Sequence, residues 1–207
     1  MERSGRSRVA RGRGPFAGGP EQARTRLVAA AEECFLDYGV RRTTMDDVAR
    51  RAGVSRPTVY RYFSDRDALI VEVVTRRARS FGVRAREYIS GRPDFPAKIV
   101  DGLGYLVRGG RRDPILRALL QPDNLSATSG ILTAGKVAEQ LTLEVWEPIL
   151  VAAQEAGEMR ADIDPRELCG VMADLEFMMI GREDLFAPGG PGVRELVGDF
   201  LLPSLVA

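Results

Sequence analysis

The sequence predicts an all-α protein with an N-terminal helix-turn-helix head on a larger helical body. Apolar residues recur every three or four positions through most of the 207 residues, which is the spacing of amphipathic helices. Helix start and stop signals separate these segments, such as Thr44 before one apolar run and Gly53 after it. No run of alternating apolar and polar residues bounded by hairpin turns, the pattern of strands, is found.

Residues 1–20 are expected to form a disordered basic arm. They hold five Arg, five Gly and two Pro, with almost no apolar side chain to bury. Two roles remain open for this arm. It is either a solubilising tail or a segment whose Arg side chains enter the minor groove of DNA beside a docked helix, as homeodomain arms do.

A first helix is expected from about Glu21, and Gly39 ends it. Its apolar face is formed by side chains that recur at helical spacing: Leu27, Ala31, Cys34, Phe35 and Tyr38.

Residues 44–69 predict two short helices joined by a tight turn, followed by the start of a third. Thr44 is a good N-cap, and Asp47 completes a capping-box pair three residues later. Gly53 supplies the left-handed backbone that ends the first of these helices. Ser55 is expected to cap the second helix, and the proline two residues later is tolerated in its first turn.

The third of these helices is expected to begin near Asp65, capped by Ser64 with Asp67, and to run to about Ile89. It is expected to be the only rigid link between head and body. A cation in its first turn opposes the helix dipole, so a phosphate partner explains Arg66 better than helix stability does.

The second short helix has the composition of a helix that reads DNA. Val59 and Phe63 point inward, which leaves Arg, Thr and Tyr side chains on the rest of the surface. Arg forks bind phosphate or guanine, Thr binds phosphate or touches a thymine methyl, and Tyr carries a long hydroxyl arm. The alternative is an ordinary helical hairpin with a polar face, which would more often carry Glu, Lys and Gln. The predicted DNA-binding residues are Arg42, Thr44, Ser55, Arg56, Pro57, Thr58, Tyr60, Arg61, Tyr62 and Arg66.

The run from Thr44 to Leu69 resembles the DNA-binding signature of the TetR (tetracycline-repressor-like) family. It has the threonine-capped helix, the AGVS turn, the T-x-Y-x-Y-F recognition helix and a basic residue before a second apolar anchor. Pro57 stands where many members have Gly, a substitution that the family also uses. The resemblance covers roughly residues 21–72. It implies a DNA-binding domain at 21–72, a helical ligand-binding and dimerisation domain at 73–207, and the function of a transcriptional regulator, most often a repressor.

The body is expected to hold five helices after chain breaks at Gly91, Pro93 and Pro96. Glycines 109 and 110 are expected to end the first of them, and Pro148 to kink or split the third. Asp164 followed by a proline is a strong start signal for the fourth. The expected ranges are 99–107, 115–120, 131–156, 164–180 and 193–205.

Two apolar stripes in the last two helices are broader than a two-helix contact needs. A single domain would bury the excess in its core, whereas the resemblance implies that these helices pair with their copies in a homodimer. A dimer also suits DNA reading, because two recognition helices bind half-sites about one helical turn apart. The stripes are formed by Leu168, Val171, Met172, Leu175, Met178 and Met179, and by Val193, Leu196, Val197, Phe200 and Leu201.

Charge is divided unevenly along the chain. Residues 1–79 hold 17 Arg and 10 acidic residues, a net charge of +7, whereas residues 80–207 carry −6. This asymmetry predicts an anionic partner, double-stranded DNA with two half-sites, at the N-terminal end and argues against nucleic acid along the body. An acidic body without His favours a neutral or cationic hydrophobic ligand over a strongly anionic one.

Composition argues against most catalytic sites. The absence of His excludes His-based triads and His-ligated zinc, and no glycine pattern cradles a phosphate. The carboxylates of the body have the spacing of exposed faces: Glu144, Glu147, Asp174 and Glu176. We therefore expect no catalytic residue, no metal and no cofactor. Cys34 and Cys169 are expected to be buried thiols, with a redox switch as the alternative.

Neither a membrane span nor a signal peptide is expected. No apolar run approaches the ~18 residues that a span needs, and the basic N-terminus lacks the apolar stretch of a signal peptide. The protein is expected to be cytoplasmic.

The body is predicted to bind a small hydrophobic effector that changes the spacing of the two heads. The candidate pocket residues are large apolar or amphipathic side chains: Tyr105, Trp146, Met172, Phe177 and Met178. At helical spacing such side chains are also typical of plain core. The alternative function is an architectural or protein-partner-gated DNA-binding protein, which would have a filled body and no small ligand.

Overall fold

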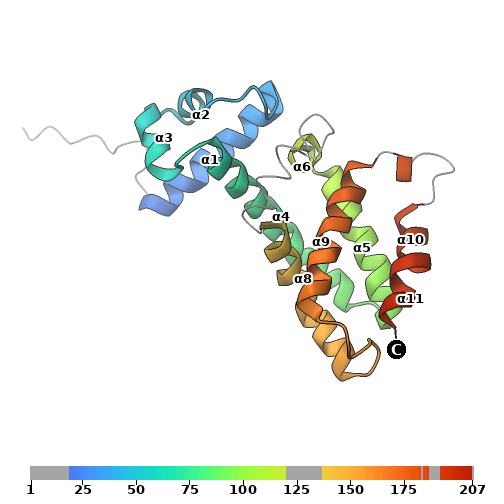
Figure 1. Cartoon of the computed structure of the whole chain (residues 1–207). Helices are drawn as coiled ribbons and strands as arrows, with labels where there is room; N and C mark the ends of the chain where they lie inside the picture. Colours follow the sequence, from blue (N-terminus) through green and yellow to red (C-terminus); the bar gives the residue numbers. More distant parts are fainter. Residues whose placement is uncertain (1–18, 120–136, 183, 187–191, 207) are drawn as a thin grey trace, which may run out of the picture.

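A computed structural model describes residues 19–119, 137–182, 184–186 and 192–206, and it confirms the all-α fold class. Every regular element in these ranges is helical, apart from a single bridge between Met159 and Val206. Figure 1 shows a small head, formed by α1 to α3 and the start of α4, at one end of a larger helical body. The expected basic arm lies outside the described residues except for Gly19 and Pro20, which already belong to α1.

The head elements are α1 (Gly19–Tyr38), α2 (Met45–Ala52), α3 (Arg56–Tyr62) and the N-terminal part of α4 (Arg66–Ser90). The capping box is confirmed. Asp47 N–H donates to Thr44 Oγ1 at 3.2 Å, and Thr44 N–H donates to Asp47 Oδ2 at 3.0 Å. Gly53 ends α2 at φ 68°, a conformation that only glycine adopts freely.

Two predicted caps are wrong. Ser55 holds the N-cap position of α3, but its hydroxyl makes a hydrogen bond with the Thr58 hydroxyl at 2.9 Å and none with a backbone N–H. The cap of α4 is Asp65, which accepts from Ala68 N–H at 2.8 Å, while Ser64 donates its hydroxyl to the Asp65 carboxylate. A carboxylate is the stronger acceptor near the positive end of a helix, which accounts for the exchange.

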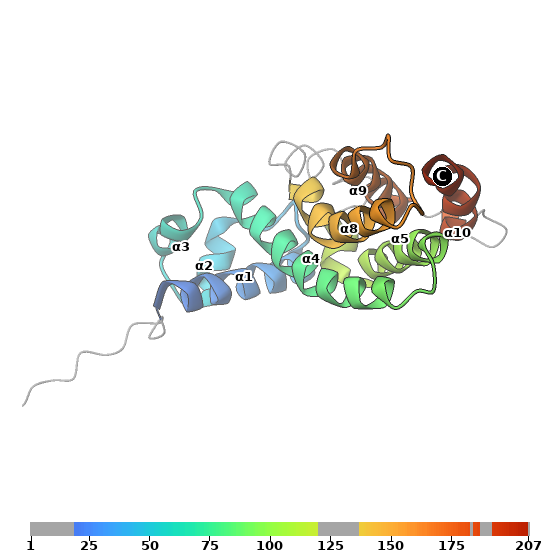
Figure 2. The same cartoon turned by 90° about the horizontal axis from the view of Figure 1, so that it is seen from below.

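In the part of the body that the structure describes, the rest of α4 is followed by six further helical segments and two short irregular ones. Figures 1 and 2 show α5, α8 and α9 running beside one another, with the C-terminal helices against α5. The segments are α5 (Phe95–Arg112), α6 (Pro114–Leu119), α8 (Val137–Glu155), α9 (Pro165–Gly181), the 3-10 turn η1 (Asp184–Phe186), α10 (Gly192–Leu196), the π-helical turn η2 (Val197–Leu201) and α11 (Leu202–Leu205).

Gly109 and Gly110 were expected to end α5, but the helix continues to Arg112. These glycines allow close packing instead, because a Cβ at Gly109 would lie 2.0 Å from Phe81 Cζ, and one at Gly110 would lie 2.6 Å from Ile180 Cδ1. Gly102 similarly leaves room for Trp146, whose Cη2 is 2.6 Å from the position of a Cβ. Pro148 lies inside α8 without splitting it.

Among the described residues, two apolar cores hold the molecule together. The body core surrounds Trp146, which is fully buried. The head core is formed by α1 to α4 and also includes Ile115 and Leu119 of α6. Phe177 of α9 packs against the same head core. The expectation that α4 is the only link between head and body is therefore wrong, since α6 connects the two as well.

Both cysteines are buried, as expected, and burial raises the pKa of each thiol. A raised thiol pKa lowers the fraction of reactive thiolate. Within the described ranges, no helix combines the length and apolar character required to cross a membrane.

Candidate DNA interface and effector pocket

Helix α3 presents a polar and aromatic face at the end of the head that is farthest from the body (Figures 1 and 2). Its inward side is fixed by Val59 and by Phe63, which follows the helix, and both are buried. Tyr60 is 41% exposed. The exposed side of α3 also carries Arg56 and Arg61, which are free to meet a partner that approaches the head.

A guanidinium from α1 holds the C-terminal end of α3. Arg24 Nη1 donates to the carbonyl oxygen of Tyr62 at 3.1 Å, and Nη2 pairs with the Glu72 carboxylate of α4. The same guanidinium lies 4.7 Å from the centre of the Phe63 ring. Arg24 therefore joins three helices and fixes the orientation of α3 relative to α1 and α4.

Arg56 is positioned by its neighbours. Its Nη1 pairs with Asp46 Oδ2 of α2 at 3.1 Å, and the guanidinium lies 5.4 Å from the ring centre of Tyr60. Hydrogen bonding to the Tyr60 hydroxyl and the charge of Asp46 raise the Arg56 pKa. Arg61 lies 5.2 Å from the ring centre of Tyr62. Side chains held in this way lose less conformational entropy when they bind.

Arg66 has partners inside the head, which the sequence analysis did not foresee. Its Nε donates to the carbonyl oxygen of Thr43 at 3.1 Å, and Nη2 donates to that of Val40. These bonds hold the segment between α1 and α2 against the first turn of α4. The structure thus accounts for an arginine at this position without a phosphate, and a DNA contact by Arg66 stays a prediction.

Two small apolar hollows adjoin one another between α4, α6, α8 and α9. Their volumes are about 120 Å³ and about 100 Å³. Phe177 lines the first and Trp146 lines the second. Both are lined by Ala78, Leu116, Leu141, Thr142, Glu176 and Ile180.

Glu176 is the ionisable group of these hollows. Its Oε1 accepts a hydrogen bond from Trp146 Nε1 at 3.0 Å. Burial raises the pKa of this carboxyl to about 7, because the charged form is poorly solvated there, while the bond from Trp146 acts in the opposite direction. A neutral carboxyl can donate a hydrogen bond through its O–H group, and an ionised one attracts a cation.

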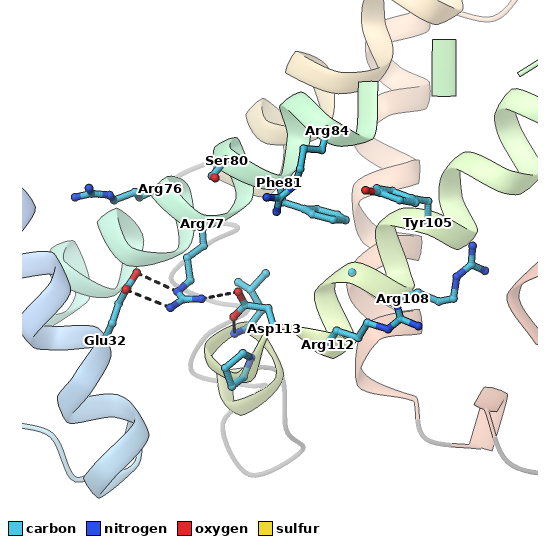
Figure 3. A pocket seen from close by; sticks show the side chains of 13 residues that line it. Glu32, Arg76, Arg77, Ser80, Phe81, Arg84, Tyr105, Arg108, Arg112 and Asp113 are labelled. Carbon is cyan, nitrogen blue, oxygen red and sulfur yellow. Dashed lines mark hydrogen bonds and ion pairs between the residues drawn. The ribbon is translucent and has the colours of Figure 1, made fainter. Parts of the chain in front are cut away.

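Two further hollows open on the surface. One of about 570 Å³ lies at the joint between head and body and is lined by arginines from α4 and α5 (Figure 3). The other, of about 280 Å³, lies between α9 and the C-terminal helices and has an apolar lining: Leu175, Met178, Met179, Leu196, Val197, Phe200 and Leu201. Within the described ranges, no group of three or more His, Cys, Asp or Glu side chains is placed to hold a metal ion.

Comparison with known proteins places the head in a family. The family model of bacterial regulatory proteins, tetR family, matches residues 27–73. An HTH-type transcriptional regulator of Mycobacterium tuberculosis is 50% identical over 50 residues, which are 24% of this chain and 26% of that protein. The match thus spans about a quarter of the length of that relative. The head of the chain is a DNA-binding domain of the tetR family.

Longer matches extend the similarity into the body. The HTH-type transcriptional regulator UidR of Escherichia coli is 25% identical over 89% of this chain and 95% of its own length. A TetR-family transcriptional regulator from Pectobacterium atrosepticum has the same fold, with a TM-score of 0.69 and 22% identity over 90% of this chain and 95% of that one. FadR of Thermus thermophilus, a TetR-family repressor solved with lauroyl-CoA, has a TM-score of 0.58 and 25% identity over 86% and 92% of the two chains.

The five predicted effector residues do not form one site. Trp146 and Phe177 line the adjoining apolar hollows. Tyr105 lines the arginine-rich hollow, and Met178 is 47% exposed beside the C-terminal helices. Met172 is fully buried in the body core and is a packing residue. Helical spacing predicts which side chains share one face of a helix, but not which other element packs against that face. It therefore cannot predict that these five side chains lie in different environments.

Two residues that shape these sites were not predicted from the sequence. Glu176 was assigned to an exposed face, but it lines the apolar hollows. Arg24 was not singled out at all. Neither leaves a local signal, since Trp146 lies 30 residues from Glu176 and Tyr62 lies 38 residues from Arg24. The other carboxylates of that group do face outward, and Glu144 and Glu147 form ion pairs with Arg79 and Arg166.

Proposed function

We propose that this TetR-family regulator is a homodimeric repressor that a small hydrophobic ligand releases from its operator. The observation that carries the proposal is the pairing of an exposed Arg- and Tyr-bearing recognition helix with apolar hollows that border both connections to the head, α4 and α6. That arrangement gives a ligand in the body a physical route to the DNA-binding end.

DNA binding would use the exposed face of α3 and the turn before α2. Arg56 and Arg61 supply forked donors for phosphate or guanine, and Thr58 and Tyr60 supply hydroxyls. Arg42 and Thr44 would meet the DNA backbone beside them. The contact between Arg56 and Asp46 supports this role, because it holds a long side chain in place before DNA arrives.

Dimerisation would use the outer face of α9 and the C-terminal helices. Phe200 is 76% exposed and Val171 is 53% exposed. Phe200 and Met178 line the apolar hollow of about 280 Å³. A second copy of the chain is the proposed occupant, because an operator with two half-sites needs two heads and a two-fold interface supplies them.

The effector would occupy the adjoining apolar hollows. They are smaller than most ligand sites, so a ligand would have to move Phe177 or Leu116 to enter. Phe177 packs against the head core, and Ala78 of α4 lines both hollows. Displacement of either would therefore act on the position of the head. The lauroyl-CoA bound to the Thermus thermophilus neighbour supports a ligand-binding body in this fold.

A thermal-shift screen followed by DNA binding tests the proposal. Hydrophobic compounds are screened for an increase in melting temperature, since a ligand of the folded state stabilises it by mass action. Compounds that pass are titrated into a complex with DNA from the region upstream of the gene. Release of DNA supports the repressor model. A body that no compound stabilises, on a protein that still binds DNA, would favour an architectural or partner-gated DNA-binding protein.

A further inference from the structure

The hollow at the joint of head and body differs in charge from the body around it. It is formed by Glu32 of α1, the middle of α4, the end of α5 and the start of α6, and it encloses about 570 Å³ (Figure 3). This volume is within the range of small-molecule sites. The lining carries five arginines and two carboxylates, a net charge of +3, although residues 80–207 as a whole are acidic.

One arginine, Arg77, forms ion pairs with both carboxylates of the hollow. Arg77 Nε and Nη2 donate to Glu32 at 3.0 and 3.2 Å, and Nη1 donates to Asp113 Oδ2 at 2.6 Å. Figure 3 shows Arg77 between the two acidic side chains. This bridge joins α1 of the head to α4 and to the end of α5. It also leaves no free carboxylate in the lining to balance the other arginines.

The remaining arginines have no ion pair with a carboxylate of the described residues. They come from two helices, α4 and α5, and their charges share one hollow. Such a set of fixed cations creates a positive potential and attracts a multiply charged anion more strongly than separate surface arginines do. These residues are Arg76, Arg84, Arg108 and Arg112.

Stacked aromatic rings provide a firm wall beside these charges. The Phe81 ring lies 5.3 Å from that of Tyr105, nearly parallel to it, and Tyr105 stacks in turn on Tyr88. The Arg84 guanidinium lies 5.8 Å from the Phe81 ring centre. An apolar wall excludes water from one side, which strengthens ionic hydrogen bonds. Ser80 and Tyr105 add hydroxyl donors to the lining.

We propose that this hollow binds a small molecule through a multiply charged oxyanion, of the pyrophosphate or phosphate-ester class. Arginine forks match the oxygen geometry of phosphate groups, and several unpaired forks in the lining of one hollow match more than one phosphate charge. DNA is a poorer occupant, because the recognition helix lies at the opposite end of the head. The anion site is distinct from the apolar hollows, which it borders through Phe81 and Leu116.

Calorimetric titration of the full chain with inorganic pyrophosphate tests the site. The test variant is Arg108→Gln with Arg112→Gln, which removes two of the unpaired charges from α5. The matched control is Arg117→Gln on the neighbouring α6, where an exposed arginine lies outside the lining. We expect the double variant to bind pyrophosphate at least about tenfold more weakly than the unaltered chain. The control should bind within about twofold of it.

The proposal fails if the unaltered chain does not bind pyrophosphate at physiological salt. It fails equally if the double variant binds as well as the unaltered chain, because binding would then come from the arginines of the head or of the N-terminal arm. Circular dichroism at the same temperature shows whether the double variant keeps its helices. If the double variant unfolds, Arg84→Gln on α4 is used in its place. Weaker binding of pyrophosphate by that variant supports the proposal, and unchanged binding contradicts it.

Discussion

The carboxyl group of Glu176 accepts a hydrogen bond from the indole nitrogen of Trp146 at 3.0 Å, between two apolar hollows. This contact connects α9 to α8 at the centre of the body. The Glu176 carboxyl lines both hollows, and its ionisation is costly in these apolar surroundings.

Stability should fall as the pH rises through the neutral range because of Glu176. Its pKa is about 7 in the folded chain and near the ordinary glutamate value of 4.5 in the unfolded chain, so the folded state binds this proton more tightly. The resulting stabilisation is complete below pH 4.5 and is lost as the pH rises through 7. The loss is on the order of 3 kcal/mol. Urea unfolding at pH 5.5 and pH 8 should show about 2 kcal/mol of this loss, because part of it already occurs below pH 5.5.

The control for this prediction is Glu176→Gln, which keeps an oxygen to accept from Trp146 but does not titrate. Its free energy of unfolding should change less between the two pH values than that of the unaltered chain. The carboxylates whose pKa is lowered, such as Asp47 and Asp65, titrate below this window. An unchanged pH dependence in the glutamine variant would show that another group is responsible.

Replacing Arg61 or Tyr60 by Ala should weaken specific DNA binding by about 1–3 kcal/mol if these side chains reach base edges or well-placed phosphates. Fluorescence anisotropy with labelled operator DNA measures the loss, at two salt concentrations so that phosphate contacts are recognised by their salt dependence. Leu36→Ala on the exposed side of α1 is the control. Unchanged affinity in both variants would contradict the assignment of α3 as the recognition helix.

Arg66→Ala should lower the stability of the head as well as any affinity for DNA. The substitution removes the hydrogen bonds to the carbonyl oxygens of Thr43 and Val40, at a cost of about 1–3 kcal/mol in unfolding free energy. Arg42→Ala removes the same charge from an exposed position and should leave stability within about 0.5 kcal/mol. Equal stability of the two variants in urea would show that Arg66 has no structural role.

Phe200→Glu should give a monomer that remains helical. Phe200 is 76% exposed in the single chain, so a carboxylate there is tolerated by the monomer but is costly in an apolar interface. Light scattering after size-exclusion chromatography gives the mass. The matched control is Leu36→Glu, which adds the same charge to a 53% exposed position in the head and should stay dimeric. If the Phe200→Glu variant stays dimeric, the dimer interface lies elsewhere on the molecule.

The local signals in the sequence were sufficient for the elements of the head and insufficient for the sites of the body. Thr44, Asp47 and Gly53 act on backbone groups within a few residues of themselves, so their roles follow from sequence alone. Gly109 packs closely against Phe81, which lies 28 residues away in the sequence. The residues around Gly109 give no sign of this contact, and the glycine was therefore predicted to end the helix. The arginine-rich hollow collects residues from α1, α4 and α5, which no single segment reveals. The net charge of residues 80–207 does not reveal this local excess of arginine either.

Filling the apolar hollows from α4 should imitate a bound effector. Ala78 lines both of them, so Ala78→Phe places a ring where the ligand is proposed to bind and pushes α4 away from α8 and α9. Because α4 runs into the head, we expect operator affinity to fall about 5- to 150-fold, the usual range of allosteric coupling. The variant should remain a dimer, and compounds that stabilise the unaltered chain should no longer raise its melting temperature. Ala78→Ser changes the same position without filling the space and should keep both operator affinity and ligand response. If Ala78→Phe folds, loses its ligand response and still binds operator as tightly as the unaltered chain, occupancy of these hollows is not what releases DNA.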